Sequence, residues 1–261
     1  MAERQTAFLM YHELEVPGRP LCNTEPGYIR YVLRVDDFRT QMELLKEQDW
    51  KGVSVGDAIR FEADRLVAIT FDDGSETDLL CAGPLLQQLG FGATFYVTSQ
   101  RLGQRGYLSP DQLRELSALG FEIGCHSMTH AYLTDLDEAG RHREIVEAKS
   151  QLEQVVGRAV EHFSCPGGRY DLGVAKMARE AGYQTLTTSE IQTNSRFTDR
   201  FSLGRIAIMR STSLGEFEKI CRGRKLWRSR MRLQVRSAGM KLLGNSLYDR
   251  MRSAWFDHTT V

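Results

Sequence analysis

Short apolar segments alternate with amphipathic helical patterns along most of this chain, and this alternation constrains the fold more than any other feature. The predicted strands cover residues 7–11, 66–69, 93–98, 121–125, 160–164, 184–188 and 205–209. Helical patterns between them include residues 79–89, 137–156 and 174–181. Because parallel strands need crossovers of about this length, the pattern predicts an α/β fold with a parallel sheet wrapped by helices. A doubly wound sheet and a barrel both fit.

Helix-capping residues support the placement of the helices. Ser109 is a good N-cap for a helix that starts with proline, and Gly90 follows the end of another helical pattern. Ser213 and Glu216 have the spacing of a capping box. Asp36 is expected to cap a helix that begins near the next residue.

Polar residues follow three of the predicted strands directly. Asp72 and Asp73 come after residues 66–69, His126 and His130 come after residues 121–125, and a Pro-Gly-Gly turn at residues 166–168 follows residues 160–164. The carboxyl ends of parallel strands meet at one edge of a sheet, where α/β folds place their functional sites. We therefore expect these side chains to lie together.

The two adjacent carboxylates need a partner. Like charges this close repel each other, and burying either one alone is costly. A carboxylate with two imidazoles and open positions for water suits a catalytic zinc or a similar divalent ion. Taken alone, Asp72 and Asp73 also fit a solvated turn, and His126 and His130 an exposed pair on a helix. The combination favours a metal site.

The motifs TFDDG at residues 70–74 and HSMTH at residues 126–130, together with the Pro-Gly-Gly turn, resemble the polysaccharide deacetylase family. This is the NodB-homology domain of carbohydrate esterase family 4, and the resemblance covers about residues 7–214. YHEL near the start and LGRIAI near the end are similar to the exopolysaccharide-type branch. The resemblance implies a distorted (β/α) barrel with seven strands.

The resemblance also implies a role for each site residue. Asp73, His126 and His130 would bind the metal, with zinc first and cobalt or nickel as alternatives. Asp72 would be the general base that activates water, and the backbone N–H of Gly167 would help to stabilise the oxyanion.

The chain departs from the family pattern at two positions. Ser164 stands where the family has an arginine that holds the catalytic aspartate, and the late Leu-x-His motif that supplies the general acid has no counterpart. We expect Arg205, at the start of a late strand, to replace the arginine. We expect His12, at the end of the first strand, to replace the acid.

The charge is unevenly distributed although the formal net charge is zero. Residues 219–261 hold eleven of the 34 basic and two of the 34 acidic residues, so this segment carries +9 and the remainder −9. The mixture of basic and large apolar residues in segment 219–261 fits either a solvated helix face or an interfacial helix on an anionic membrane. Nucleic acid is not an expected partner, because no recognition fold accompanies the charge. We predict a deacetylase domain at 1–218 and a basic helical extension at 219–261.

The cysteines and the N-terminal residues bear on the cellular compartment of the protein. Five cysteines at irregular spacing do not form a disulfide framework, and the first residues show no signal-peptide pattern. No segment approaches the about 20 apolar residues of a spanning helix. We predict a cytoplasmic protein, with the inner membrane face as a place of attachment.

The predicted function is a metal-dependent de-N-acetylase. Its substrate would be an amino-sugar-containing polysaccharide or a lipid-linked glycan precursor in exopolysaccharide or envelope assembly. One alternative is another amide or ester hydrolase on the same scaffold. Another is a catalytically weakened module that binds glycan or organises a synthesis complex, which the two departures motivate.

Overall fold

A curled sheet of eight strands forms the centre of the molecule in this computed structural model, which describes residues 4–224. The strands all pair in parallel, and their bounds are β1 Ala7–Tyr11, β4 Lys51–Val53, β5 Leu66–Phe71, β6 Thr94–Val97, β7 Glu122–Cys125, β8 His162–Ser164, β9 Thr185–Thr187 and β10 Ile206–Ala207. The order is β10-β1-β5-β6-β7-β8-β9, and β4 pairs with β5 off this path. The path has the predicted seven strands, and β4 is an eighth that lies beside the first half of β5.

The two edges of this sheet approach each other through a single segment. Leu203 forms a parallel bridge with Thr187 of β9, and four residues later Ala207 of β10 pairs with Met10 of β1. The sheet therefore curls towards closure, which confirms the distorted (β/α) barrel expected from the sequence.

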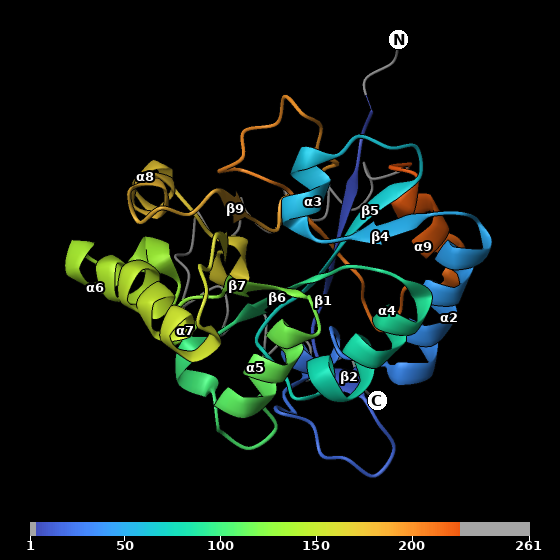
Figure 1. Cartoon of the computed structure of the whole chain (residues 1–261), viewed down its shortest axis with the longest axis horizontal. Coiled ribbons are helices and arrows are strands. Elements are labelled where there is room, and N and C mark those ends of the chain that lie inside the picture. The colour runs from blue at the N-terminus through green and yellow to red at the C-terminus, as the bar shows by residue number, and fades with distance from the viewer. Residues whose placement is uncertain (1–3, 225–261) are drawn as a thin grey trace.

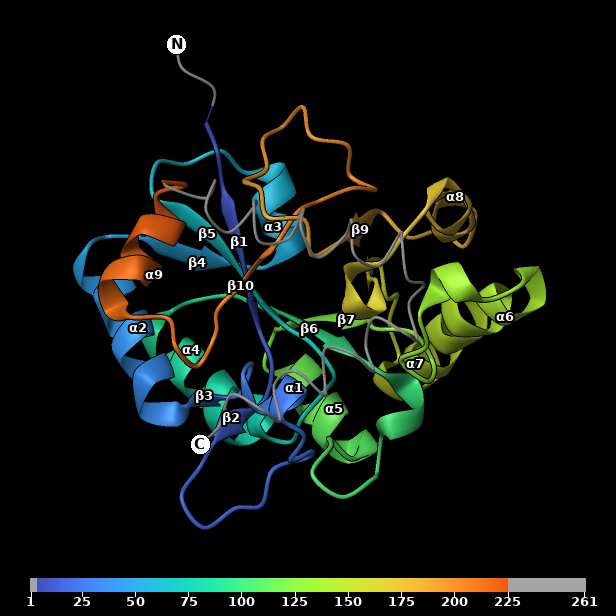
Figure 2. The ribbon, with the colours of Figure 1, turned by 180° about the vertical axis from the view of Figure 1, so that it is seen from behind.

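Helices surround the sheet on its outer side (Figures 1 and 2). The α-helices are α1 Pro26–Ile29, α2 Val35–Glu47, α3 Val55–Arg60, α4 Gly83–Leu89, α5 Pro110–Ala118, α6 Glu138–His142, α7 Ala148–Val156, α8 Leu172–Glu180 and α9 Leu214–Cys221. Two π-helical segments, η1 Asp78–Ala82 and η4 Arg143–Glu147, lead into α4 and α7. The short 3₁₀ turns are η2 Ser99–Arg101, η3 Leu133–Asp135 and η5 Pro166–Gly168, and a separate small sheet pairs β2 Leu14–Glu15 with β3 Leu33–Arg34.

Most helix ends follow the sequence signals. Ser213 accepts a hydrogen bond from the Glu216 backbone N–H at the start of α9, which is one half of the predicted capping box. Ser109 forms a capping box with Gln112, and Gly90 ends α4 in the left-handed conformation. The predicted Asp36 cap is wrong, because α2 begins at Val35 and its N-cap Arg34 makes no side-chain cap bond. Arg34 also ends β3, so the chain passes directly from a paired strand into the helix.

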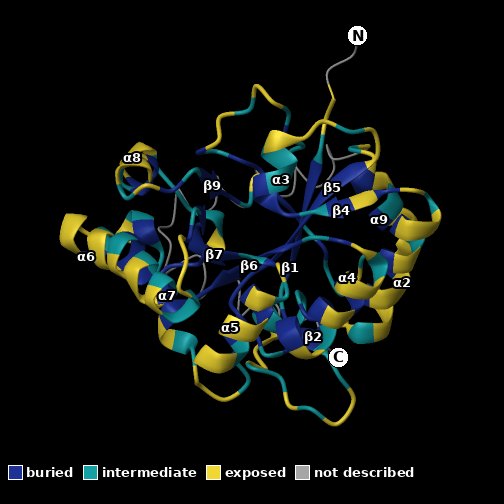
Figure 3. Ribbon diagram, viewed as in Figure 1, coloured by how far each residue is buried: buried dark blue, intermediate teal, exposed yellow. Residues whose placement is uncertain are grey.

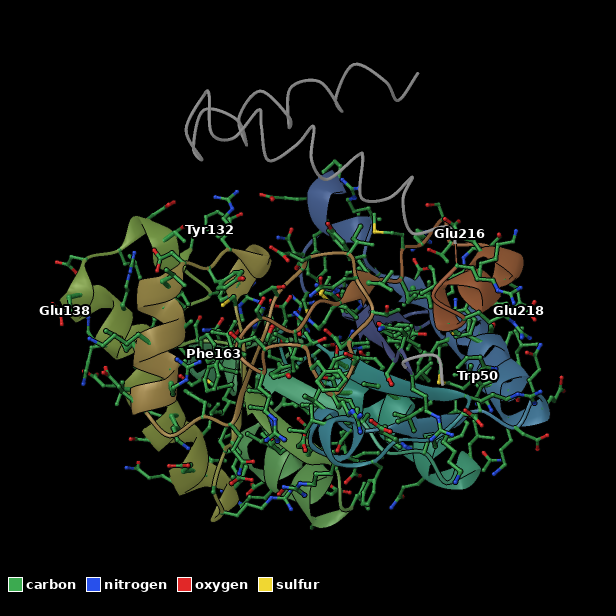
Figure 4. All side chains as sticks on the ribbon, turned by 90° about the horizontal axis from the view of Figure 1, so that it is seen from above. Trp50, Tyr132, Glu138, Phe163, Glu216 and Glu218 are labelled. Atoms are coloured by element: carbon green, nitrogen blue, oxygen red, sulfur yellow. The ribbon has the colours of Figure 1, made fainter. Side chains whose placement is uncertain are left out.

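The hydrophobic core fills the space between the sheet and the helices. Figure 3 shows the strands as buried and the outer helix faces as exposed. The Phe71 ring of β5 lies 5.0 Å from the Phe95 ring of β6 and 5.5 Å from the Phe38 ring of α2. Burial of each such side chain stabilises the fold by about 1.5–3 kcal/mol. From above, Phe163 of β8 lies among the interior side chains and Glu138 of α6 lies at the outer edge (Figure 4).

The C-terminal part of the described chain belongs to this core. Phe217, Ile220 and Cys221 of α9 are buried, so the proposed domain boundary after residue 218 falls within a helix that packs on the body. The membrane-binding hypothesis for the basic extension concerns mainly residues 225–261, which lie outside the described residues. None of the helices within residues 4–224 has the length and apolar composition of a membrane span.

Candidate metal centre

The polar residues that follow the strands meet at the carboxyl edge of the sheet, as their positions in the sequence predict. His12 follows β1, Asp72 follows β5 and His126 follows β7. Backbone hydrogen bonds from Asp72 to Tyr11 and from His126 to Val97 extend the pairing to the edge itself. The edge therefore brings together side chains that are up to about a hundred residues apart in the sequence.

Asp73, His126 and His130 form one cluster, called here the Asp–His–His cluster. Their ligand atoms all lie within 4.8 Å of one another. His126 Nε2 lies 3.8 Å from Asp73 Oδ1, and His130 Nε2 lies 3.4 Å from the same oxygen. Among the described residues, this is the one group of three or more His, Cys, Asp or Glu side chains that could hold a metal ion.

The hydrogen bond of His126 sets which nitrogen faces the cluster. Its Nδ1 lies 2.9 Å from the backbone oxygen of Ser164, which can only accept, so Nδ1 carries the proton. The lone pair of Nε2 then points towards the carboxylates, which is the usual orientation of a metal-ligating histidine. Burial lowers the pKa of His126 to about 4, so the ring is neutral at neutral pH and free to act as a ligand.

Backbone strain is concentrated in the same place. Asp73 has φ 81°, Ser127 has φ 64° and His130 has φ 68°, although none of them is glycine. Such conformations cost about 1–3 kcal/mol each and persist only where the surroundings impose them.

The donor set of the cluster fits a divalent ion. Asp73 Oδ1 is buried and has no hydrogen-bond donor directed at it, and two neutral imidazole nitrogens can face it. Oxygen and imidazole ligands together suit zinc and related ions. Arg101 also lies close, with Nη1 2.9 Å from Asp73 Oδ1, but this ion pair lacks hydrogen-bond geometry.

Asp72 is held by a different partner from Asp73. Arg205 donates from Nη1 to Asp72 Oδ1 and from Nη2 to Asp72 Oδ2, both at 2.7 Å, and also from Nη2 to Ser164 Oγ at 2.7 Å. Burial opposes ionisation of Asp72, but Arg205 and His126 outweigh it and hold the pKa of Asp72 well below its usual range. The expected substitute for the missing arginine thus lies against Asp72, and Ser164 accepts a bond from it.

His12 lies within electrostatic range of this pair. Its Nδ1 is buried without a hydrogen-bond partner, and its ring centre is 4.9 Å from that of Tyr31. Burial lowers the pKa of His12, against the opposing effect of Asp72 and Asp73. The imidazole is therefore neutral at neutral pH, and its role as an acid stays a prediction.

Gly167 occupies a turn that only glycine fits. Its φ is 61°, and a Cβ there would lie 2.8 Å from Cε1 of Tyr132. Tyr132 follows the HSMTH motif, and Figure 4 labels it toward the opposite end of the molecule from Trp50. The Pro-Gly-Gly turn thus packs against the segment that carries the histidines, while the role of Gly167 in binding an oxyanion stays a prediction.

Sequence reasoning missed several groups around the cluster. Arg101 lies four residues after the end of β6, so its position at the same edge was the available signal. Glu144 and Asp78 are buried in the π-helical segments, and their sequence positions do not indicate this. Glu13 is buried and accepts hydrogen bonds from Arg19, the Cys22 backbone and the Tyr28 hydroxyl.

Comparison with known proteins identifies the family to which the segment with the Asp–His–His cluster is similar. The family model for polysaccharide deacetylases matches residues 61–186, which include all three members of the Asp–His–His cluster. The segment of residues 61–186 therefore belongs to the polysaccharide deacetylase family. The family segment contains β5 to β8 and most of β9. Arg205 and His12 lie outside it, directly before β10 and directly after β1.

Curated relatives match half of the chain or less. The chain is 35% identical over 127 residues to a peptidoglycan-N-acetylglucosamine deacetylase of Bacillus cereus, which covers 48% of this chain and 57% of the relative. It is 35% identical over 104 residues to a chitooligosaccharide deacetylase of Rhizobium leguminosarum bv. trifolii, covering 38% and 46%. The chain spans about half the length of the curated relatives it matches.

Solved structures share the fold over most of the chain. Streptococcus pyogenes deacetylase PplD, solved in complex with acetate, superposes with a TM-score of 0.74 at 21% identity, over 84% of this chain and 99% of that chain. IcaB from Ammonifex degensii superposes with a TM-score of 0.70 at 20% identity, over 84% and 97%. At these identities, the likeness shows the family fold.

Proposed function

We propose that this protein is a metal-dependent hydrolase that removes N-acetyl groups from an amino-sugar-containing glycan. One observation carries the proposal. A carboxylate and two neutral imidazoles converge beside a second carboxylate that is held by its own arginine. This division separates a group that can bind an ion from a group that can move a proton.

The Asp–His–His cluster would hold the ion, with zinc first and cobalt or nickel as alternatives. When bound, a divalent ion there would polarise the acetamide carbonyl and lower the pKa of water. Asp73, His126 and His130 supply one negative charge, which leaves the site positive and suited to developing negative charge on an oxygen.

Asp72 takes the proton from the attacking water in this proposal. Arg205 fixes both of its oxygens and keeps it ionised, which orients the base. The same contacts lower the basicity of Asp72, because its pKa lies well below the usual range. Arg205 thus lowers the proton affinity of Asp72 but fixes the orientation of its carboxylate.

The remaining steps of the proposed reaction use Gly167 and His12. In this proposal the water oxygen bonds to the carbonyl carbon, and the backbone N–H of Gly167 stabilises the oxyanion. His12, which is neutral at first, receives the proton that Asp72 took from water and delivers it to the leaving nitrogen as the C–N bond breaks. The products are a free amine and acetic acid, which releases its proton to solvent as acetate, so Asp72 is again ionised and His12 again neutral.

A cavity whose lining contains no member of the Asp–His–His cluster is linked to it through Tyr107 and Arg101 and has room for a polar ligand. Its volume is about 340 Å³, and its lining includes Arg19, Tyr107 and Gln112. The Tyr107 ring lies 5.2 Å from the Arg101 guanidinium, and Arg101 pairs with Asp73. Ligand pockets in proteins begin at about 300 Å³, so the volume is sufficient.

The substrate is proposed to be a polysaccharide or a lipid-linked glycan precursor of exopolysaccharide or envelope assembly. We further propose a cytoplasmic location with attachment to the inner membrane face through the basic segment 219–261, based on its charge of +9. The test is flotation with anionic liposomes at low and high salt. Absence of flotation at both salt concentrations would remove the membrane proposal.

Acetate release tests the activity itself. The zinc-loaded protein is incubated with N-acetylated chito-oligosaccharides, and acetate and free amine are quantified in equal amounts if the proposal holds. The Asp73→Ala variant and the chelator-treated protein should fall to background. Zinc uptake without turnover of any acetylated sugar would favour the glycan-binding module instead, and turnover of O-acetyl but not N-acetyl groups would favour the ester hydrolase.

A further inference from the structure

We propose that Glu144 is a positioning residue for the metal centre, which holds the backbone between His126 and His130 in the shape that aligns both imidazoles. The inference rests on the proposed function, because it assumes that the Asp–His–His cluster binds an ion. Glu144 lies outside the cluster, in the π-helical segment η4.

The contacts of Glu144 all go to the histidine segment. Its Oε2 accepts hydrogen bonds from the backbone N–H groups of Met128 and Thr129, both at 2.9 Å. Its Oε1 accepts from the Thr129 hydroxyl at 2.6 Å. The residue is 6% exposed, so water does not compete freely for these bonds. Hydrogen bonds to a carboxylate are shorter and stronger than those between neutral groups.

The segment needs such support because it is strained. Ser127 and His130 on either side of Met128 and Thr129 both have positive φ values, 64° and 68°. One side of the segment is held from η2, where the backbone N–H groups of Ser99 and Gln100 donate to Ser127 and Met128 oxygens. Glu144 instead accepts hydrogen bonds from the backbone N–H groups of the segment, so the carbonyl groups and the N–H groups are both held.

The π-turn explains how Glu144 reaches the segment. Residues 138–156 form a nearly continuous helix in which η4 joins α6 to α7. A π-turn inserts one residue and rotates the helix face, and such insertions are frequent at functional sites. Here two consecutive residues, Glu144 and Ile145, are both buried. The carboxylate therefore points into the protein instead of into solvent.

Zinc affinity separates a positioning role from a general contribution to stability. The variant is Glu144→Ala, and the matched control is Glu153→Ala, in which the lost carboxylate bonds the Val160 backbone N–H at 2.9 Å away from the cluster. Zinc dissociation constants are measured on the full chain by chelator competition, and Tm by thermal unfolding without zinc. Loss of an outer-shell partner typically weakens metal binding by about 10–100-fold.

The expected result is a zinc affinity about 10–100-fold weaker in Glu144→Ala and unchanged in Glu153→Ala, although both variants lose Tm. Glu144→Gln should bind zinc within about threefold of the original chain, because one amide oxygen can still accept both N–H bonds. If Glu144→Ala does not fold, Glu144→Asp takes its place, since its shorter side chain withdraws the oxygens from Met128 and Thr129.

Wild-type zinc affinity in the folded Glu144→Ala, or in Glu144→Asp where that replaces it, would overturn the proposal and leave the hydrolase proposal intact. Equal weakening in Glu153→Ala would also overturn it, because the effect would then follow stability alone. A wild-type chain that takes up no zinc would instead overturn the proposed metal-dependent function together with this inference.

Discussion

Asp72 and Asp73 are neighbours in the sequence and share His126, whose Nε2 lies 3.8 Å from an oxygen of each, but their other partners differ. Asp73 faces His126, His130 and Arg101, whereas Asp72 forms a bidentate pair with Arg205. The repulsion expected between two adjacent carboxylates is thus relieved by different cationic or metal-binding surroundings for each one.

Arg205→Lys should move the acid limb of the pH profile of kcat/KM to higher pH. Lysine keeps the charge but loses the bidentate contact, so the depressed pKa of Asp72 rises and the base is protonated at a higher pH. The measurement is acetate release between pH 4 and 9. An unchanged acid limb would contradict the role of Asp72 as base.

Arg205→Ala should also destabilise the fold. Removing one partner of a buried pair typically lowers the free energy of unfolding by about 3–5 kcal/mol. The depressed pKa of Asp72 contributes stability above its unfolded pKa of about 3.9, and this is lost as pH falls through the folded pKa. Chemical denaturation at pH 7 compares the variant with Arg179→Ala, an exposed arginine whose loss should have little effect.

His12→Gln should lower kcat by about 10²–10⁴-fold if His12 is the general acid. Zinc affinity should stay within a few fold, because His12 does not belong to the Asp–His–His cluster. His142→Gln on the surface of α6 is the control and should keep full activity. Activity of His12→Gln close to that of the original chain would assign the acid to another group.

At the scale of elements, two π-helical segments carry buried carboxylates that no periodicity indicates. Glu144 of η4 binds the histidine segment, whereas both oxygens of Asp78 in η1 are buried without a hydrogen-bond partner. Burial, with Asp73 and Glu13 nearby, raises the pKa of Asp78 well above its usual value. Asp78 therefore keeps its proton in the folded chain above the pH at which an exposed aspartate loses it.

Asp78→Asn should raise Tm, and the gain should grow as the pH rises above about 3.9, the unfolded pKa of an aspartate. A carboxyl whose pKa is raised on folding holds a proton that the unfolded chain releases above about pH 3.9, so it lowers stability increasingly as pH rises. Asparagine removes this dependence. Thermal unfolding at several pH values measures it, and a Tm gain that is constant with pH would contradict the assignment.

At the scale of the whole molecule, the Asp–His–His cluster joins β5 to β7 across the curled sheet. A ligand that binds only the folded chain stabilises it by an amount set by its concentration relative to its dissociation constant. The metal should therefore act as a cross-link between elements far apart in the sequence.

Zinc at about 100 times its dissociation constant should stabilise the chain by about 2.7 kcal/mol and raise Tm accordingly. Asp73→Asn should lose this gain, and Asp37→Asn, an exposed residue on α2, should keep it. Thermal unfolding with and without zinc is the measurement. The same zinc-dependent rise in Asp73→Asn would place the ion elsewhere.

The sequence by itself determined the alternation of strands and helices, the capping residues Ser109 and Gly90, and the positions of Asp72, Asp73, His126 and His130 at strand ends. These depend on local periodicity and on short motifs, which neighbouring residues specify. It also indicated Arg205 by its place at the start of a late strand, although the contact with Asp72 joins residues 133 apart.

Only the tertiary structure decided which of these groups touch. The curl of the sheet brings the segment before β10 against Asp72, and the π-turn directs Glu144 at the histidine segment. Both depend on the packing of elements distant in the sequence, and no local pattern encodes them. The partners of Asp73 likewise depend on where η2 places Arg101, which follows from strand order and register.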